Sequence, residues 1–452
     1  MSTLIPANEI ADDSLSFAEA TMRVFRWRGG LYRAVAGEQA TFCRRLFDTG
    51  VVSELVERRF LGDSRLTSLT REGYDLVIEH VPVPVVSYPE EWCAPMLEAG
   101  ARLVLDLAEA LDKWDLALVD AHPWNVLFEP GRRQPIFVDW GSIAQQSGGP
   151  WVDVQPFRNF WLNPLKLMAR GQSRTARLLI AADALGVRDE DLDPSNFRDG
   201  TPVPLVRLRR RVERVLASAT SKGSREHLAD IRRLRNELDG VASAPRQRTP
   251  SPSSTNTLAP EMRDAVTRVL DELRPDTVLN LGCGRGELAR LAAEDERVVV
   301  AVDIDDEAVA SLYLSSCESG ARILPLVLDI MRPTPARGWL SAFGRSAVER
   351  MRSSLVIAID VVHDLTLCIN NPHVGPAIIS FRHLAEALSA FSTRHVLVEF
   401  RSLDHPDLAS WRSSYNAPEY TREGFVSALA RAFGRITEVA SVGHSTLFLC
   451  ER

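Results

Sequence analysis

The sequence lacks long apolar runs, paired cysteines and a surplus of basic residues, and each absence excludes a class of protein. No segment approaches the roughly 18–20 apolar residues of a membrane-spanning helix. The N-terminal stretch Met1–Ala20 is acidic and has no apolar core, unlike a signal peptide. A net charge of −7 argues against broad nucleic-acid binding, which needs a basic surface. We therefore expect a cytoplasmic protein that neither crosses a membrane nor binds nucleic acid.

The cysteines are few and scattered, with neither a CxxC nor another ligand spacing between them. Such a pattern predicts reduced thiols without a disulfide frame and without a zinc site. The six residues are Cys43, Cys93, Cys283, Cys317, Cys368 and Cys450.

Large apolar residues are also nearly absent from Val241–Pro260, which is rich in Pro, Ser, Thr and Ala. Such a composition cannot bury enough surface to fold and predicts a flexible linker at 241–260. At 452 residues the chain is long enough for two domains, which we predict at 1–240 and 261–452. Within the first domain, helical spacing over Leu205–Leu238 predicts a hairpin with a solvated basic face. The alternative is a docking surface for an acidic partner.

The most informative stretch that is present is Thr277–Asp303, TVLNLGCGRGELARLAAEDERVVVAVD. The apolar run Val278–Leu281 meets a turn with glycine at 282, 284 and 286; a helix-like segment follows, and a second apolar run ends in Asp303. This order is typical of a nucleotide-handling βαβ unit. The glycines let the backbone approach a ligand closely, and the acid can accept both hydroxyls of a ribose. The spacing differs from the G-x-G-x-x-G of dinucleotide-binding proteins, and this difference disfavours NAD as the ligand. The alternatives are another nucleotide-type ligand and a purely structural turn.

Strands and helices continue to alternate after Asp303. Helices are predicted at Ile304–Leu314 and near Pro376–Phe391. Ligands in such sheets sit at the carboxyl ends of the strands, where Asp329 and Asp360 follow two of the apolar runs. We predict the α/β class, with a Rossmann-like sheet closed by an antiparallel pair and further strands at Ile323–Leu328, Leu355–Ile359, His395–Phe400, Arg435–Ala440 and Ser445–Leu449.

The glycine turn resembles the first motif of class I S-adenosylmethionine (SAM) methyltransferases. The resemblance implies SAM as cofactor, with the turn at its amino-acid end, Asp303 on the ribose, and Asp329 or nearby backbone at the adenine amine. The residue before the turn is often acidic in these enzymes, whereas here it is Asn280, which removes a charge near the sulfonium. The implied cofactor-binding residues are Asn280, Gly282, Cys283, Gly284, Gly286, Asp303, Ile304, Asp329 and Ile330.

Methyl transfer is a direct displacement, so placing the acceptor in line with the methyl group supplies much of the acceleration. A base is needed only if the acceptor must lose a proton. His363, three residues past Asp360, is the best candidate, with a binding or structural role as its alternative. Asp360 and Asp364 are weaker catalytic candidates. The acceptor is not identified by the sequence, and we favour a small molecule or modified metabolite.

The same half resembles a narrower group, the NoeA-like host-specific nodulation proteins and related bacterial methyltransferases. The resemblance spans most of Leu279–Phe433, and its LPLVLDI…P…GW phrase is much more specific than the glycine turn. It implies a SAM methyltransferase without naming an acceptor. The matching words are NLGCGRGELARLA, ILPLVLDIMRPTPARGW (Ile323–Trp339), AIDVVHDL (Ala358–Leu365), VEFRSLDHP (Val398–Pro406) and YTREGF (Tyr420–Phe425).

A second constellation lies in the first half, where Asp120-Ala-His-Pro-Trp-Asn125 is followed by IFVDWG (Ile136–Gly141). It resembles kinases and aminoglycoside phosphotransferases, in which an Asp accepts the substrate proton while an Asn and a second Asp bind Mg²⁺. The resemblance assigns these roles to Asp120, Asn125 and Asp139. It implies an α+β kinase-like domain, in which the apolar helix predicted at Ala94–Trp114 has a counterpart.

Parts that hold phosphate in an active kinase are missing from this half. It has no G-x-G-x-x-G loop, and no lysine precedes Lys113. Arg33, in the strand-like LYRAV, is the one candidate substitute, and a guanidinium replaces a point charge poorly. We predict a non-catalytic domain for substrate positioning or regulation, with a metal only if Mg-nucleotide binds. The alternatives are a bifunctional enzyme with an active phosphotransferase domain and a non-enzymatic binding or regulatory protein.

Overall fold

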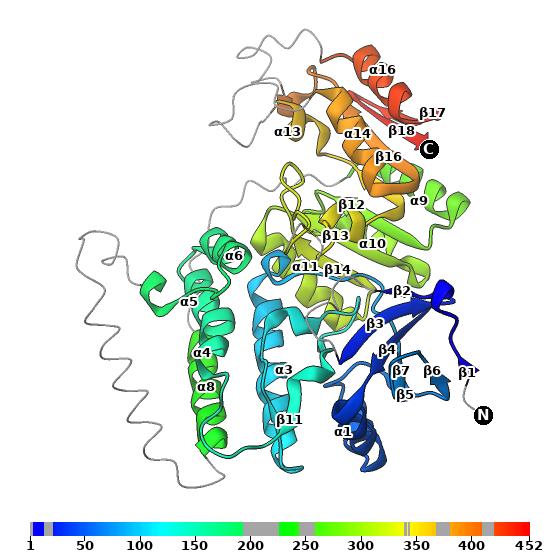
Figure 1. The fold of residues 1–452 in the computed structure, drawn as a ribbon. Coiled ribbons are helices and arrows are strands. Elements are labelled where there is room, and N and C mark those ends of the chain that lie inside the picture. Colours follow the sequence, from blue (N-terminus) through cyan, green and yellow to red (C-terminus); the bar gives the residue numbers. More distant parts are fainter. Residues whose placement is uncertain are drawn as a thin grey trace. The chain divides into compact units, whose positions relative to one another are not determined.

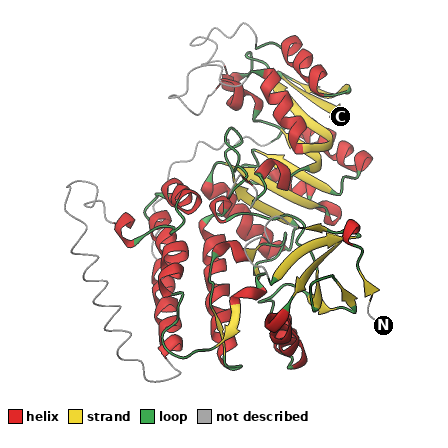
Figure 2. Ribbon diagram, viewed as in Figure 1, coloured by secondary structure: helices red, strands yellow, loops and turns green. Residues whose placement is uncertain are grey.

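The computed structural model describes residues 3–12, 21–192, 226–243, 258–338, 341, 344–367, 380–408 and 420–452. Its contacts divide the chain into two compact units (Figure 1). Both units mix helices and strands (Figure 2). Unit 1 comprises Met1–Val83, Tyr88–Phe128 and Gln134–Thr249, and unit 2 comprises Pro84–Ser87, Glu129–Arg133 and Pro250–Arg452.

Unit 1 begins with a five-stranded antiparallel sheet. Its strands are β2 (Ala11–Asp12), β3 (Met22–Trp27), β4 (Gly30–Val35), β5 (Ser64–Leu66) and β7 (Leu76–His80). They lie in the order β2-β3-β4-β7-β5. One face packs Met22, Val35 and Ile78 against helix α1 (Gly37–Asp48). Arg33 is paired with Ile78 across β4 and β7, so its side chain projects from this same face.

The remainder of unit 1 is mostly helical and is organised around α3 (Ala94–Asp112), which confirms the helix predicted there. Helix α8 (Glu226–Ala242) packs on α3, with ion pairs from Arg235 to Asp106 at 2.7 Å and from Arg102 to Asp239 at 2.8 Å. Residues 205–225 of the predicted hairpin lie outside the described residues. Further elements are β1 (Thr3–Leu4), α2 (Val51–Glu57), β6 (Leu69–Thr70), β8 (Leu116–Leu118), β9 (Val126–Leu127), β10 (Ile136–Phe137), β11 (Ile143–Gln145), α4 (Val154–Phe157), α5 (Asn163–Ala169) and α6 (Ser173–Ala182).

Unit 2 is built on a seven-stranded sheet. Its strands are β12 (Thr277–Leu281), β13 (Val298–Asp303), β14 (Ile323–Val327), β15 (Ser353–Ala358), β16 (Ser392–Arg401), β17 (Arg435–Val442) and β18 (Ser445–Glu451). The order is β14-β13-β12-β15-β16-β18-β17, with β18 antiparallel to both neighbours and the first five strands parallel. The predicted strands and the closing antiparallel pair are confirmed. The strand order reverses beside β12, and open α/β sheets bind ligands at such a reversal.

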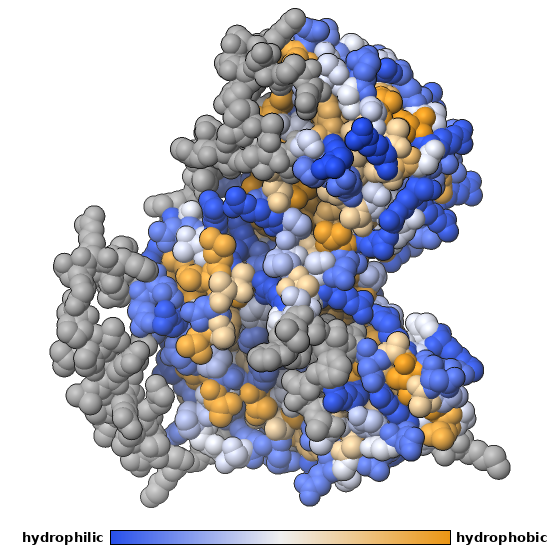
Figure 3. Space-filling model, turned by 45° about the horizontal axis from the view of Figure 1, so that its top comes forward, coloured by the Kyte–Doolittle hydropathy of each residue, from blue (hydrophilic) through white to orange (hydrophobic). Residues whose placement is uncertain are grey.

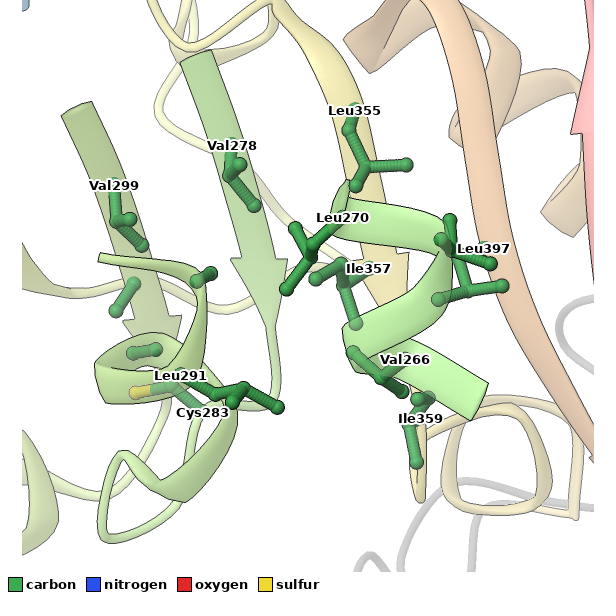
Figure 4. Packing of buried hydrophobic residues seen from close by; sticks show 14 of the residues in the cluster. Val266, Leu270, Val278, Cys283, Leu291, Val299, Leu355, Ile357, Ile359 and Leu397 are labelled. Atoms are coloured by element: carbon green, nitrogen blue, oxygen red, sulfur yellow. The ribbon is translucent and has the colours of Figure 1, made fainter. Parts of the chain in front are cut away.

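Helices cover both faces of this sheet. On one face, Val266 and Leu270 of α9 (Pro260–Leu273) pack against Ile357 of β15 in an apolar cluster (Figure 4). On the other, Phe400 of β16 contacts the rings of Phe381 in α14 (Phe381–Phe391) and of a phenylalanine in α16 (Arg422–Ala432). Covering both faces explains the nearly continuous apolar strands. The other helices are α10 (Glu287–Ala292), α11 (Asp306–Ser319), α12 (Ala347–Arg350) and α13 (Val362–Leu367).

Two predicted helices begin later than the apolar pattern suggested, because a polar residue caps each one. Helix α11 begins at Asp306, since Asp305 accepts hydrogen bonds from Glu307 N at 2.9 Å and Ala308 N at 3.3 Å. Helix α14 begins at Phe381, since Ser380 accepts one from His383 N. Residues 376–379, and residues 244–257 of the predicted linker, lie outside the described residues.

Exposed large apolar side chains are scattered over the chain. Val152 in unit 1 is 66% exposed and Ile304 in unit 2 is 65% exposed. On the face drawn in Figure 3, hydrophilic residues separate smaller hydrophobic areas. No helix in the described part of the chain combines the length and apolar character needed to cross a membrane.

Candidate functional site

The turn between β12 and α10 has a backbone that glycine adopts most readily. Gly282, Gly284 and Gly286 have φ angles of +66°, +48° and +82°. A Cβ at Gly282 would lie 2.0 Å from Val361 Cγ1, and one at Gly286 would lie 2.3 Å from Leu312 Cδ1. Internal packing therefore also requires glycine at these two positions. A Cβ at Gly284 would meet nothing within 4 Å, so open space adjoins the turn at the position suited to a ligand.

Asp303, at the carboxyl end of β13, holds the glycine turn directly. Its Oδ2 accepts a hydrogen bond from Gly284 N at 2.7 Å, and its Oδ1 accepts one from Asp305 N at 2.9 Å. Burial raises the pKa of Asp303, although these backbone donors oppose the shift. A carboxylate has about four acceptor positions, so Asp303 can fix the turn and still accept a ligand hydroxyl.

Ile304 directly follows Asp303 at the end of β13. Asp329 and Ile330 come just after the end of β14. A hydrogen bond from Leu328 N to Asp303 O, at 2.9 Å, joins the two strand ends. Asp329 Oδ1 accepts a bond from Met331 N at 2.9 Å, which fixes its turn. The large exposed fraction of Ile304 offers an apolar surface for a flat ring next to these acids.

Asn280 lies in β12 just before the turn, and Cys283 lies within the turn. Asn280 is fully buried; its Nδ2 donates a long bond of 3.4 Å to Leu281 O, and its Oδ1 has no hydrogen-bond partner among the described residues. A buried acceptor without a partner suits a ligand donor such as the ammonium group of SAM. Cys283 packs into the apolar cluster with Leu291 (Figure 4), and burial raises the pKa of its thiol well above the usual range. Its side chain therefore anchors the turn to this cluster.

The loop after β15 and the end of β16 bring a set of charged side chains together. Arg401 Nη1 lies 2.6 Å from Asp360 Oδ1, and Arg401 Nη2 lies 3.4 Å from Glu399 Oε1. Glu399 Oε2 accepts a hydrogen bond from Asp360 N at 2.8 Å. His363 Nε2 lies 3.6 Å from Asp360 Oδ1 and 3.8 Å from Asp364 Oδ1. His363, Glu399 and Arg401 are all buried, so these charges interact in a medium that screens them weakly.

Asp360 holds a backbone conformation that is uncommon for a residue with a side chain. Its φ is +63°, in the left-handed region. The amide bond to Glu399 and the ion pair to Arg401 hold it there. Conformations of this kind cluster at functional sites, where the surrounding contacts over-determine them. The geometry therefore favours Asp360, which the sequence ranked below His363, as a central member of this group.

Sequence reasoning missed Glu399, Arg401 and Tyr420. A signal was present, because the apolar strand HVLVEFR ends in two charged residues spaced two apart, which places both on one face of the strand. Charged groups on a buried strand need partners. Tyr420 donates a hydrogen bond from its hydroxyl to Arg401 O at 3.0 Å, and burial raises the pKa of its phenol above the usual range.

In unit 1 the structure brings Asp120, Asn125 and Asp139 into one cluster. Asn125 Nδ2 donates to Asp120 O at 3.4 Å and to Ser142 Oγ at 3.3 Å. The Ser142 hydroxyl donates to Asp139 Oδ2 at 2.5 Å. Burial, and then the charge of Asp139, raises the pKa of Asp120. Arg33, the candidate substitute for the missing lysine, joins the cluster by pairing with Asp139 at 3.2 Å.

Three further titratable groups in unit 1 were not singled out from the sequence. Asp153 Oδ2 accepts a hydrogen bond from Ala121 N at 2.9 Å, and burial raises the pKa of Asp153 to about 6. Burial lowers the pKa of His122 to about 4, where its ring stacks on Trp124 at a centroid distance of 4.2 Å. Burial, with the charge of Arg33 as a smaller cause, lowers the pKa of His80 to about 3. Both imidazoles are therefore neutral at pH 7.

Comparison with known proteins finds a relative over most of the chain. No protein-family model matches the sequence. The chain is similar to nodulation protein NoeA of Rhizobium meliloti (strain 1021), with 24% identity over 390 residues that cover 79% of this chain and 80% of NoeA. The resemblance noted for the second half thus extends into the first.

Solved structures, two of them of methyltransferases, are similar over smaller parts of the chain. Monomeric WbdD matches with 16% identity over 42% of this chain and 39% of its own, at a TM-score of 0.29, so the match spans well under half of WbdD. An O-methyltransferase family protein from Burkholderia thailandensis matches with 16% identity over 42% of this chain and 55% of its own, at a TM-score of 0.30. Magnesium protoporphyrin IX methyltransferase from Synechocystis PCC 6803, with bound SAH, matches with 14% identity over 44% of this chain and 90% of its own, at a TM-score of 0.29. Because these TM-scores are low, the likenesses carry no weight for the function.

Proposed function

We propose that unit 2 is a SAM-dependent methyltransferase that acts on a small molecule or modified metabolite. The observation that carries the proposal is a convergence at the carboxyl edge of the sheet. There the open turn at Gly284 is held by Asp303 beside the reversal of strand order, and the group of Asp360 and His363 follows the neighbouring strand β15. The motif at Thr277–Asp303 supports the same assignment. The net charge of −7 disfavours a nucleic-acid acceptor.

The residues of this edge fit the chemical parts of SAM. The orphaned Oδ1 of Asn280 suits the ammonium group, and the backbone at Gly284 allows the amino-acid end to approach. Asp303 suits the ribose hydroxyls. Ile304 suits the flat face of the adenine, and Asp329 its exocyclic amine. When bound, SAM supplies an electrophilic methyl group. The neutral Asn280 in place of an acid weakens attraction for the positive sulfonium.

On the acceptor side, His363 is the proposed general base for an acceptor that must lose a proton. The side chain of Asp360, which is paired with Arg401, lies near His363 and would stabilise the imidazolium formed on proton transfer. Holding the acceptor against the methyl group supplies the remaining acceleration through proximity and orientation.

For unit 1 we propose a kinase-like accessory role in substrate positioning or regulation, without phosphoryl transfer. The cluster of Asp120, Asn125 and Asp139 supports the kinase-like assignment. The absence of lysine before Lys113 and the pairing of Arg33 with Asp139 support the non-catalytic one. An active phosphotransferase domain is the competing function.

Calorimetric titration of the full chain with S-adenosylhomocysteine (SAH) tests the cofactor assignment. We expect saturable binding within the range of about 1 μM to 1 mM that is usual for enzymes and their substrates. No binding at about 1 mM would refute it. Incubation with methyl-labelled SAM and a cell extract tests the acceptor class, because label that enters macromolecules rather than small molecules would exclude the proposed acceptor.

A further inference from the structure

Arg33 is buried inside the acidic cluster of unit 1, where the resemblance to kinases implies a divalent cation. It projects from β4 onto the α1 face of the sheet and is 9% exposed. Its Nη1 lies 3.2 Å from Asp139 Oδ1 and 3.7 Å from Met22 Sδ, while its Nη2 donates to Val138 O at 3.1 Å. Three contacts therefore fix the guanidinium against Asp139.

Asp139 is engaged by protein donors through both of its oxygens. Its Oδ1 accepts from Arg33 and from Gly141 N, each at 3.2 Å, and its Oδ2 accepts from the Ser142 hydroxyl at 2.5 Å. These three bonds use most of the roughly four acceptor positions of the carboxylate, so a Mg²⁺ or Mn²⁺ ion would have to take the position that is left or displace one of the donors.

The charge balance of the cluster also opposes a metal. An ion bound to Asp139 would lie next to the positive guanidinium, and like charges in a buried site repel strongly. Displacing Arg33 would leave a buried guanidinium without its counterion, which is strongly unfavourable. The residues present at this cluster therefore do not fit a divalent cation.

We propose that Arg33 takes the place of the divalent cation at the Asp139 cluster, so that unit 1 binds neither Mg²⁺ nor Mn²⁺ and any polar ligand is held there without a metal. A single positive charge on the protein replaces the ion that would otherwise neutralise Asp139. All the residues involved lie in unit 1, so the proposal stands or falls independently of the methyltransferase proposed for unit 2.

Titration of the full chain with Mn²⁺, followed by the paramagnetic resonance signal of the free ion, tests this directly. The wild type should take up no Mn²⁺ at this cluster, alone or with ADP present. Arg33→Met removes the charge while keeping an unbranched side chain, and it should create Mn²⁺ uptake at this cluster that the wild type lacks. Adding Asp139→Asn to that variant should abolish the gain. No group of three or more His, Cys, Asp or Glu side chains among the described residues is arranged to hold a metal.

The control is Arg26→Met, which removes an exposed arginine from the neighbouring strand β3 and should leave Mn²⁺ uptake as in the wild type. Mn²⁺ binding by the wild type that disappears in Asp139→Asn would overturn the proposal. A folded Arg33→Met variant that still binds no Mn²⁺ would overturn it as well. If Arg33→Met does not fold, Arg33→Gln replaces it, and the wild-type titration decides in either case.

Discussion

Replacing Asp303 should weaken both the glycine turn and the binding of SAH, and the structure shows how to separate the two effects. Asp303→Ala removes the acceptor for Gly284 N and Asp305 N, as well as any contact to a ribose. Asp303→Asn keeps one amide oxygen as an acceptor and loses the charge. Comparing the two variants therefore distinguishes a residue that only fixes the turn from one that also binds the ligand.

The expected magnitudes follow from the two hydrogen bonds. Bonds to a charged acceptor contribute about 1.5–3 kcal/mol each, and solvent can reach part of this site, so Asp303→Ala should lower the free energy of unfolding by about 2–4 kcal/mol. Loss of the charged contact to a ribose should weaken SAH binding by about 2–3 kcal/mol, or roughly 30- to 150-fold. Asp303→Asn should destabilise unit 2 by only about 1 kcal/mol and still weaken SAH binding by roughly tenfold.

Urea unfolding and calorimetry with SAH measure the two quantities on the same preparations. Asp305→Ala is the matched control, since Asp305 caps α11 and should cost about 1 kcal/mol of stability without changing SAH affinity. An Asp303→Asn variant that binds SAH as tightly as the wild type would refute the ribose assignment. Asp303 would then serve only to fix the turn.

Three further predictions concern the acceptor site and unit 1. His363→Ala should reduce labelled methyl transfer into extract by roughly 10²–10⁴-fold while its affinity for SAH stays unchanged. If this variant transfers methyl groups at the wild-type rate, His363 is not part of the acceptor site. Radiolabelled ATP with Mg²⁺ or Mn²⁺ should yield no phosphate transfer to extract, and transfer lost in Asp139→Ala would contradict this. Because the pKa of Asp153 rises from 3.8 to about 6 on folding, the native state keeps a proton that the unfolded chain loses, so the contribution of Asp153 to the free energy of unfolding should fall as pH rises from about 4 to 6. His80 and His122, whose pKa values are lowered, contribute with the opposite sign, so the contribution of Asp153 is measured as the difference between the wild type and Asp153→Asn. Asp153→Asn should raise the free energy of unfolding by at most about 3 kcal/mol at pH 7 and by little at pH 4. An equal gain at the two pH values would exclude the titration of Asp153 as its cause. Tryptophan fluorescence would report this for unit 1, since only Trp339 and Trp411 of the nine tryptophans lie outside it.

The sequence alone determined the features that depend on near neighbours in the chain. The glycine spacing at 282, 284 and 286 predicted a turn, and all three residues have positive φ. Apolar runs ended by acids located the strands of unit 2, because burial on both faces demands continuous apolar segments. Helix starts were less well predicted, since Asp305 and Ser380 set them through single capping bonds that the apolar pattern does not record.

Only the tertiary structure decided which charged groups meet. Asp360 follows the end of β15 and Arg401 is the last residue of β16, and the pairing of these strands brings the two side chains within 2.6 Å. Arg33 and Asp139 are 106 residues apart in the sequence. The sequence made Arg33 a candidate to bind phosphate, whereas in the structure it pairs with the carboxylate of Asp139. Asp303, which the sequence assigned to a ribose, also accepts a hydrogen bond from the glycine turn. A sequence specifies which side chains can carry charge, but the partner of each charge follows from strand order and register, because these alone place distant residues within bonding distance.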